Sequence, residues 1–465
     1  MSEKSQILNY KFDINAFSPD VYSKAIYIID KLKQNGHVAF FVGGCVRDVL
    51  MGIQPHEIDI TTSATPELIK TIFEKVYLVG EKFGVCVVNV DGKDFEVSTF
   101  RKDAPYEDGR HPSFVTFSNP KEDAMRRDFT INALFWEPME SKLYDYVGGL
   151  DDIHDAVIRA VGNPVERFEE DRLRIIRCAR FISQLNFSVD RETYEAIFKI
   201  KDPLKGISVE RLRDELEKIL MTQYPSVAVN VLYEIGILKK ILPELCAMRD
   251  VPQPPEFHPE GDVWTHTMLS LDVAAKEIRD RDIILMWAVL LHDVGKPPTI
   301  TMPTDKNDRI RFNGHDVEGE KLTRKILTRL RLPNKIIDDV AYIVKDHMRI
   351  GKAQEIKKGR LKLIIANAVF KKELDLNYID IMASHKDLST WDFLKKEYEE
   401  FKKQQQLPKA IIDGEMLIKM GYKPSPAFSG IIDKAYEAQL EGIFSDEQGA
   451  KKFVKSLKIK TESKK

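Results

Sequence analysis

Glu57 and Asp59, in the segment HEIDITT, are two carboxylates separated by a single apolar residue. On a β-strand alternate residues share a face, so both acids would point one way while Ile58 and Ile60 point into the core. Two carboxylates held side by side repel each other unless a cation lies between them, which favours a hard divalent ion such as Mg²⁺. Taken alone, the pair also fits an ordinary solvated strand face, and that alternative stays open.

Other residues near this pair strengthen the metal interpretation. Glu96 in DFEVSTF alternates with apolar residues, so three carboxylates converge if its strand pairs beside the first. Such a trio would hold two ions roughly 3.5–4 Å apart, one to activate an attacking hydroxyl and one to stabilise a leaving pyrophosphate. Upstream, Gly43 and Gly44 would let the backbone approach a triphosphate. Arg47 would add a charge-assisted hydrogen bond to phosphate.

The elements that would position these residues form a mixed α/β segment at the start of the chain. Apolar positions at helical spacing predict a helix over 18–36, ending in Asn-Gly. Thr65 and Pro66 open a second helix, and the Asp91–Gly92 turn joins two strands. From Val165 onward nearly every segment has helical periodicity, including all of residues 165–185. Strands are predicted at 37–42, 57–62, 84–90 and 94–100, with a short helix at 46–52.

Length and composition limit the class of protein. A chain of 465 residues is too long for one core, so about two to four domains are expected. The content of 43% hydrophobic and 31% charged residues is typical of globular proteins, and we expect no transmembrane helix or secretory signal. Four dispersed cysteines fit reduced thiols in the cytoplasm. The net charge of −2 argues against a chain that coats nucleic acid non-specifically.

Four segments resemble ordered motifs of one family. GGCVRDVLMGIQPHEIDITT resembles motif A of the bacterial tRNA nucleotidyltransferase and poly(A) polymerase family, which includes the CCA-adding enzymes. RRDFTINALFW resembles motif B, YDYVGGLDDI motif C and EEDRLRIIRCARF motif D, in the family's order over about residues 41–181. The family usually has Asp-x-Asp where this chain has Glu57 as the first acid. A glutamate is one methylene longer and still binds Mg²⁺.

Motif D contains residues suited to reading a base edge. Helical spacing predicts that Glu170, Asp171 and Arg174 share one helix face. The resemblance implies that Asp171 and Arg174 read the incoming base, and Arg177 and Arg180 belong to the same nucleotide-binding motif. Cytosine and adenine both present an amino donor beside an acceptor nitrogen, which a carboxylate next to a guanidinium complements, whereas uracil and guanine do not. A surface ion-pair cluster is the alternative for these residues taken alone.

Motif B and two further segments bear on which nucleotides are added. The resemblance implies that motif B contacts the nucleotide and sugar, although a structural pair at a helix start is an alternative for its charged residues. The polar loop 101–117 resembles a flexible loop of A-incorporating members and favours CCA or A addition; a long β-connection is the alternative. Glu81-Lys82 stands where the family's poly(A) polymerases carry a basic pair, which favours a tRNA-directed enzyme. The motif B residues are Arg126, Arg127, Asp128 and Asn132.

Histidines and aspartates gather in the second half of the chain. Neutral imidazoles with aspartate suit a transition-metal ion such as Mn²⁺, Fe²⁺, Co²⁺, Ni²⁺ or Zn²⁺. The segments resemble the HD phosphohydrolase superfamily, which implies metal-dependent phosphodiesterase or phosphatase activity. For any one histidine alone, a satisfied structural role is the alternative. The matching core residues are His266, His292 and Asp293, with Asp380 as the closing aspartate and His315 and His347 as additional ligands.

The fold class expected is an α+β head followed by an all-helical neck, an HD-type body and a tail. A helix at 207–220, with Ser208 as its N-cap, lies in the neck, where the family holds acceptor-stem RNA. The tail resembles the family's RNA-contacting segment, with Ser425 where a glycine is usual. The five parts are an N-terminal helical extension (1–36), the nucleotidyltransferase head (37–160), the neck (161–250), the HD domain (251–385) and the C-terminal tail (386–465).

The function expected from the resemblance is template-independent, Mg²⁺-dependent addition of CCA to the 3′ end of tRNA. The substrates would be CTP, ATP and the tRNA acceptor stem, with release of pyrophosphate in the cytoplasm. Alternatives within the family are an A-adding or CC-adding enzyme and a poly(A) polymerase. Alternatives outside it are an HD phosphohydrolase with a non-catalytic RNA-binding head and a non-catalytic RNA-binding protein. The sequence does not specify an oligomeric state.

Overall fold

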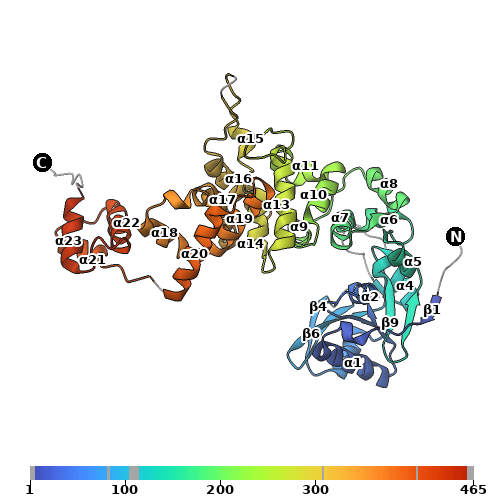
Figure 1. Cartoon of the computed structure of the whole chain (residues 1–465). Coiled ribbons are helices and arrows are strands. Elements are labelled where there is room, and N and C mark those ends of the chain that lie inside the picture. Colours follow the sequence, from blue (N-terminus) through green and yellow to red (C-terminus); the bar gives the residue numbers. More distant parts are fainter. Residues whose placement is uncertain (1–5, 81–83, 104–114, 306–307, 405–406, 458–465) are drawn as a thin grey trace. The chain divides into compact units, whose positions relative to one another are not determined.

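The computed structural model describes residues 6–80, 84–103, 115–305, 308–404 and 407–457 (Figure 1). The chain divides into two compact units, Met1–Ile241 and Leu242–Lys465. The Glu81-Lys82 pair lies outside the described residues, as does most of the loop predicted at 101–117. The ends of that loop form β7 (Arg101–Asp103) and β8 (Val115–Phe117), which pair antiparallel.

A mixed sheet forms the centre of the first unit, and within the described residues it has eight strands. Neighbouring strands run antiparallel except β3 (Asp59–Thr62) and β6 (Lys93–Thr99), which are parallel, with Ile60 opposite Val97. The predicted strands at 37–42, 57–62, 84–90 and 94–100 correspond to β2, β3, β5 and β6. The order across the sheet is β1 (Gln6–Asn9), β10 (Lys142–Asp145), β9 (Leu134–Glu137), β2 (Ala39–Val42), β3 (Asp59–Thr62), β6 (Lys93–Thr99), β5 (Val85–Val90) and β4 (Val76–Gly80).

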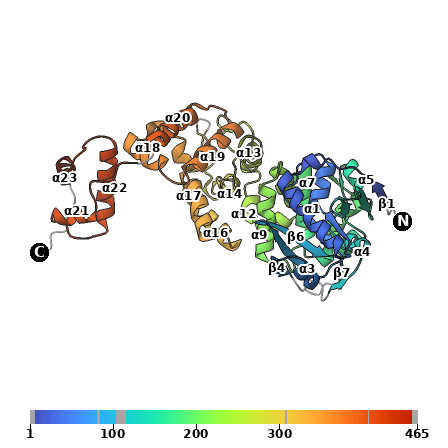
Figure 2. The same cartoon turned by 90° about the horizontal axis from the view of Figure 1, so that it is seen from below.

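Each face of this sheet is covered by apolar side chains. Helix α1 (Pro19–Gln34) lies across one face, where Ile28, Ile29 and Leu32 are fully buried against the strands (Figures 1 and 2). On the other face a second apolar cluster includes Phe40, Val42, Phe100 and Phe135. The shorter helices of the head are α2 (Gly44–Leu50), α3 (Pro66–Ile72), α4 (Pro120–Met125) and α5 (Gly149–His154).

The N-terminal segment contains an element that helical spacing did not indicate. The helix predicted over 18–36 is present as α1, but residues 6–9 form the edge strand β1, which pairs antiparallel with β10. A strand of four residues is too short for a recognisable alternating pattern, and its partner lies more than a hundred residues away.

Helices form the remainder of the first unit. The prediction of one continuous helix through residues 165–185 is wrong, because α6 (Pro164–Glu170) ends before α7 (Leu173–Leu185) begins. Asp171 between them is extended, with φ −145° and ψ 103°. Ser208 caps α9 (Val209–Leu220) as predicted, accepting a hydrogen bond from the amide of Arg211. The other elements are α8 (Arg191–Lys199), α10 (Pro225–Glu234), α11 (Ile237–Ile241) and the parallel pair β11 (Val157–Ile158) and β12 (Ser188–Val189).

The second unit is built from helices around one apolar helix. Helix α14 (Ile283–Leu291) has a buried side chain at every position from Leu285 to Leu291, and it packs against α13 (Val263–Glu277), α17 (Asn334–Ile350) and α19 (Phe370–Ala383). The fold class is therefore confirmed as a mixed-sheet head followed by helices. Elements around this core are α12 (Pro243–Cys246), α15 (Lys296–Thr299), α16 (His315–Arg329), α18 (Lys358–Ile365) and α20 (Ser389–Gln404).

A separate small core closes the C-terminal part of this unit. Ile412, Leu417, Ala435 and Val454 pack together from three helices and the segment before them. Across the whole described part of the chain, none of the helices has the length and apolar content needed to cross a bilayer. The helices of this part are α21 (Gly414–Lys419), α22 (Ala427–Leu440) and α23 (Glu447–Ser456).

Candidate active site and candidate metal centre

The three predicted carboxylates meet at the start of the parallel strand pair. Asp59 is the first residue of β3, and Glu57 precedes the strand by two positions. Glu96 on β6 lies one residue before Val97, as Asp59 lies one residue before the opposing Ile60. Ile58 is buried, so the alternation of acid and core residue continues beyond the end of the strand. The structure thus brings the three acids to one place.

The electrostatics of this trio leave negative charge uncompensated. The pKa of Asp59 is raised to about 7, first by burial and then by the neighbouring charges of Glu96 and Glu57, while Arg127 opposes the shift. The pKa of Glu96 is also raised, by loss of solvent and by Glu57. Carboxylates that are reluctant to ionise together are the donor set that a hard divalent cation satisfies. The residues present therefore fit such an ion.

The glycine turn faces this trio. Gly43 has φ +79° and ψ −135° at the N-terminus of α2, a conformation that side-chain-bearing residues rarely adopt. A Cβ atom placed there would lie 3.8 Å from Asp59 Oδ2 and 3.5 Å from Arg127 Nη1. The next residue, Gly44, begins α2 close to the guanidinium of Arg47. The turn therefore leaves room beside the acids and one cationic side chain.

Metal binding at this trio should depend on pH. Because the pKa of Asp59 lies above its ordinary 3.8, the folded metal-free protein keeps a proton there and loses stability as pH rises toward about 7. A divalent cation binds the ionised form, so the rise in melting temperature caused by Mg²⁺ should be larger at about pH 8 than at about pH 6. Thermal melts with and without Mg²⁺ measure this difference. Asp59→Asn should remove it, and an equal Mg²⁺ effect at both pH values in the wild type would contradict the prediction.

Motif B is tied into buried ion pairs. Arg126 and Arg127 both donate to Asp123 of α4, with Nε–Oδ1 and Nη2–Oδ2 distances of 2.8 and 3.0 Å. Arg177 of α7 donates twice to Asp128 Oδ2, at 2.9 and 2.6 Å. Burial alone would raise the pKa of Asp128, but Arg177 outweighs it and holds that pKa below its usual range. The ion pair between Asp128 and Arg177 therefore links motif B to motif D.

Arg47 and Asn132 extend this buried network. Arg47 is a buried residue, 3% exposed, and its guanidinium donates to Asp48 Oδ1 at 2.6 Å and to Asn132 Oδ1 at 2.7 Å. Asn132 in turn donates to Asp128 Oδ1 at 3.3 Å. The predicted phosphate ligand Arg47 thus has its guanidinium engaged by protein groups, and it supports the motif B residues from below the glycine turn. It also lies against the ring of Phe181, 5.4 Å from the centroid.

The residues of motif D do not share one helix face. Because the helix ends before Asp171, the side chain of that residue turns to α9, where Arg211 Nη2 and Nη1 donate to it at 2.6 and 3.2 Å. Asp171 also accepts from the amide of Leu173, which stabilises the break. Arg174 pairs instead with Glu170, at 2.6 Å. The predicted single face is wrong because these contacts favour an extended conformation at position 171.

Arg180 and several residues that sequence reasoning missed complete this region. Arg180 donates to Glu215 of α9 at 2.7 Å and stacks on Phe181. Asp123, Arg211 and Glu215 each anchor a predicted nucleotide-binding residue. For Asp123 the spacing of three and four residues before two arginines was a usable signal. Arg211 and Glu215 lie 35 or more residues from their partners, so local pattern gave none.

In the second unit the six predicted metal ligands come together. His266 of α13, His292 at the end of α14 and Asp380 of α19 form one group whose ligand atoms lie within 4.8 Å of one another. A second group consists of Asp293, His315 and His347, from the end of α14, α16 and α17. All but Asp380 are buried, and nitrogen with carboxylate donors suits a transition-metal ion.

Glu260 is a further member of this centre that the sequence did not reveal. Its Oε1 lies 2.6 Å from His266 Nδ1, on the side of the ring away from the other ligands. A carboxylate in that place fixes the orientation and tautomer of a ligating histidine.

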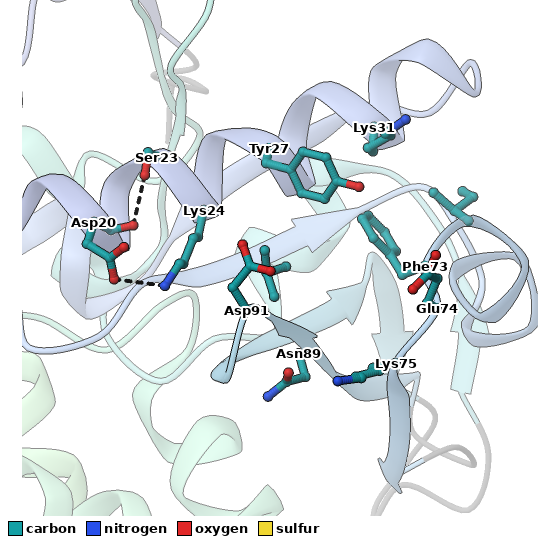
Figure 3. A pocket seen from close by; sticks show the side chains of 12 residues that line it. Asp20, Ser23, Lys24, Tyr27, Lys31, Phe73, Glu74, Lys75, Asn89 and Asp91 are labelled. Carbon is teal, nitrogen blue, oxygen red and sulfur yellow. Dashed lines mark hydrogen bonds and ion pairs between the residues drawn. The ribbon is translucent and has the colours of Figure 1, made fainter.

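A hollow of about 800 Å³ lies in the first unit, between α1 and the β5–β6 turn (Figure 3). Tyr27, Lys31 and Asp91 are among its lining residues, and none of the predicted site residues lines it.

Three families match consecutive parts of the chain. Residues 39–159 match the poly A polymerase head domain, residues 186–248 match the probable RNA and SrmB-binding site of polymerase A, and residues 263–412 match the HD domain. The first match contains motifs A to C and the acids at 57, 59 and 96. The third contains all six ligands of the metal centre.

Two curated relatives each match about half of this chain. A CCA-adding enzyme of Bacillus pumilus (strain SAFR-032) is 44% identical over 221 residues, 47% of this chain and 55% of the relative. A CCA-adding enzyme of Lactobacillus helveticus (strain DPC 4571) is 37% identical over 266 residues, 56% of this chain and 66% of the relative. The aligned part thus spans only about half the length of the first relative and about two thirds of the second.

Solved structures extend the likeness to most of the chain. The Bacillus stearothermophilus CCA-adding enzyme in complex with CTP has a TM-score of 0.68 at 26% identity, covering 94% of this chain and 98% of that one. The Thermotoga maritima CCA-adding enzyme complexed with tRNA has a TM-score of 0.57 at 20% identity, covering 94% and 96%, and shows the fold alone. With the ordered motifs and the three consecutive family matches, these findings place the chain in the bacterial tRNA nucleotidyltransferase and poly(A) polymerase family, in a form that carries an HD domain.

Proposed function

We propose that this protein adds CCA to the 3′ end of tRNA, taking the nucleotides from CTP and ATP and releasing pyrophosphate. The observation that carries the proposal is the meeting of Glu57, Asp59 and Glu96 beside the Gly43 turn. Relatives named CCA-adding enzymes, and a similar structure solved with CTP, support it. The place of action proposed is the cytoplasm, where tRNA and nucleoside triphosphates meet.

The three acids would hold the divalent cation, for which we propose Mg²⁺ because every donor is a carboxylate oxygen. When bound, such a cation activates the attacking 3′ hydroxyl and stabilises the pyrophosphate that leaves. Gly43 and Gly44 leave space for the triphosphate, and Arg127 supplies positive charge beside it. Arg126, Asp128 and Asn132 would position the nucleotide from the network behind the turn.

Base selection is proposed for the motif D residues. Asp171 would accept from the amino group that cytosine and adenine share, and Arg174 would donate to the neighbouring ring nitrogen. Glu170 holds Arg174, while Arg177 and Arg180 fasten α7 to motif B and to α9. Arg211 orients Asp171 from the neck, so it would act as a positioning residue for the base.

Replacing Arg211 should weaken discrimination between bases. Arg211→Met leaves the Asp171 carboxylate without its bidentate partner, and we expect selection of CTP over UTP to fall by roughly tenfold to a hundredfold, equivalent to about 1–3 kcal/mol. The measurement is the ratio of kcat/KM for the two nucleotides, with tRNA affinity measured separately. Arg213→Met on the same helix, where the arginine pairs with the exposed Asp214, is the matched control. Equal loss for both nucleotides would contradict the positioning role.

The proposed activity is tested with tRNA transcripts that lack the last one, two or three nucleotides. Each is incubated with CTP, with ATP and with both. Completion of all three transcripts with both nucleotides supports CCA addition, and extension of only the first by ATP indicates an A-adding enzyme. Addition of C alone indicates a CC-adding enzyme, and long tails from ATP indicate a poly(A) polymerase. No addition to any transcript would contradict the proposal and favour a head without catalytic activity.

The HD region carries a second proposed function, hydrolysis of a phosphate ester with a transition metal. Its support is the gathering of four histidines and two aspartates, all buried except Asp380. We keep the proposed division into head (37–160), neck (161–250), HD domain (251–385) and tail (386–465). The family matches at 39–159 and 186–248 fall inside the first two parts, whereas the HD match extends to residue 412, into the proposed tail.

A further inference from the structure

We propose that Phe181 is a positioning residue for nucleotide addition, because its aromatic face keeps the helix after the glycine turn at a fixed distance from the base-reading helix. This inference rests on the function proposed above. Phe181 lies on α7 and is 3% exposed. The guanidinium groups of Arg47, Arg177 and Arg180 lie over its ring, with their central carbon atoms 5.4, 5.6 and 4.2 Å from the centroid. The ring is therefore a common neighbour of cations from motif A and motif D.

The aromatic face of this residue matters beyond its volume. The face of an aromatic ring is negative and its edge is positive, so a cation within about 6 Å of the centroid is attracted to the face. All three guanidinium groups lie within that distance. The attraction is stronger where water is excluded than at an exposed site. A leucine at position 181 would fill much of the same space without offering a negative face.

Each guanidinium over the ring also has a carboxylate partner of its own. The acids come from three different parts of the first unit, namely α2, motif B and α9. Phe181 therefore lies where three ion pairs from separate elements meet on one helix, α7. The pairs, with donor–acceptor distances of 2.6, 2.6 and 2.7 Å, are Arg47–Asp48, Arg177–Asp128 and Arg180–Glu215.

Hydrogen bonds and ring contacts form a closed loop that includes Phe181. Arg47 Nη1 donates to Asn132 Oδ1 at 2.7 Å, and Asn132 Nδ2 donates to Asp128 Oδ1 at 3.3 Å. Asp128 accepts from Arg177, which lies over Phe181, and the opposite end of the chain, Arg47, lies over the same ring. A shift of α7 relative to α2 must therefore break either a ring contact or one of these hydrogen bonds.

Two of the cations lie close enough to repel each other. Burial lowers the pKa of Arg180, and the charge of Arg177 lowers it further, while Glu215 opposes both effects. The negative face of the ring offsets part of this repulsion because it attracts both guanidinium groups. An aliphatic side chain at position 181 would leave the repulsion in place, and α7 would settle at a different distance from α2.

The position of α7 bears on the rate of the reaction more than on nucleotide binding. Helix α7 carries Arg174, proposed to read the base, about two turns before Phe181. Helix α2 begins at the glycine turn proposed to accept the triphosphate. The two contact sites must match the fixed separation of base and phosphate in one nucleotide, and a misplacement of about 1 Å costs up to about a hundredfold in rate. Each site keeps its own contacts, so affinity would persist while alignment is lost.

Graded fluorination of the ring tests this role with little change in its shape. Phenylalanine carrying one, two or three fluorine atoms is placed at position 181 of the full chain, and each fluorine makes the ring face less negative. We expect kcat for addition of A to tRNA lacking its last nucleotide to fall stepwise, by about tenfold over the series, with KM for ATP changed by less than about twofold. Phe181→Leu should lower kcat at least as far, whereas Phe181→Tyr, which keeps an aromatic face, should retain most of it. Thermal melts check that each variant folds.

Phe187, buried just beyond the end of α7, is the matched control. Among the residues that the structure describes, no guanidinium lies over its ring, so the same fluorinated series there should leave kcat unchanged. A constant kcat through the series at position 181 would overturn the positioning role while leaving CCA addition intact. A rise in KM for ATP at constant kcat would also overturn it, because only binding would then be lost. Absence of addition by the unsubstituted protein would remove the proposed function and this inference together.

Discussion

Asp59→Ala should abolish nucleotide addition, with a fall in rate of at least about a thousandfold, while the protein keeps its fold and its affinity for tRNA. A cation at a reacting phosphate contributes several kcal/mol of transition-state stabilisation, and each 1.4 kcal/mol is about a factor of ten in rate. Asp59 is the acid most affected by the others, since burial, Glu96 and Glu57 all raise its pKa. The ionised form of Asp59 therefore gains most from a bound cation.

The measurement is single-turnover extension of tRNA lacking its last nucleotide, with tRNA binding followed separately by filter retention. Removal of an acid with a raised pKa relieves repulsion, so the melting temperature near pH 8 should not fall. Asp94→Ala, at an exposed acid on the same strand as Glu96, is the matched control and should retain full activity. Unimpaired extension by Asp59→Ala would remove the carboxylate trio from the mechanism.

Arg177→Met should destabilise the first unit by about 3–5 kcal/mol, because it leaves the buried Asp128 carboxylate without its guanidinium. For a unit of this size that corresponds to a drop in melting temperature of roughly 10 °C. In the wild type, Arg177 lowers the pKa of Asp128, so this contribution to stability is present above about pH 4 and is lost as pH falls further. In the variant, burial is opposed only by weaker contacts such as those of the Phe129 amide and Arg174, so the pKa of the carboxyl should rise and it should take up a proton at higher pH.

The stability deficit of Arg177→Met should therefore be larger at about pH 8 than at about pH 5. Thermal melts of wild type and variant at both pH values measure it. Arg191→Met removes an exposed arginine paired with Glu195 and should change stability by at most about 1 kcal/mol. A deficit that does not change with pH would show that the loss comes from packing rather than from the stranded charge of Asp128.

The sequence was sufficient to predict the position of residues whose placement depends on local periodicity or residue type. Ile58 and Ile60 alternate with acids, which indicated the strand and the shared face of Glu57 and Asp59. The glycine turn could be predicted from residue type alone, because glycine readily adopts positive φ values such as the one that Gly43 has in the structure. The HD ligands were found as a set through matching flanks, although the sequence did not divide them into two groups.

Features that depend on partners distant in the chain could not be predicted. Nothing near Asp171 indicates that its carboxylate binds Arg211, 40 residues away, so helical spacing gave a continuous helix where the structure has a break. Glu215 holds Arg180 across 35 residues in the same way. The edge strand β1 was missed because its stability comes from pairing with β10 rather than from its own composition.

The break at Asp171 affects how the two proposed base-reading side chains are held relative to each other. Asp171 lies between two helices, and its carboxylate accepts hydrogen bonds from Arg211 of α9. The orientation of the Asp171 carboxylate therefore depends on α9 rather than on α7, the helix that carries Arg174. For an enzyme that adds nucleotides as proposed above, a small tilt of α9 would therefore move Asp171 relative to Arg174 and change the spacing of the two side chains proposed to read the base.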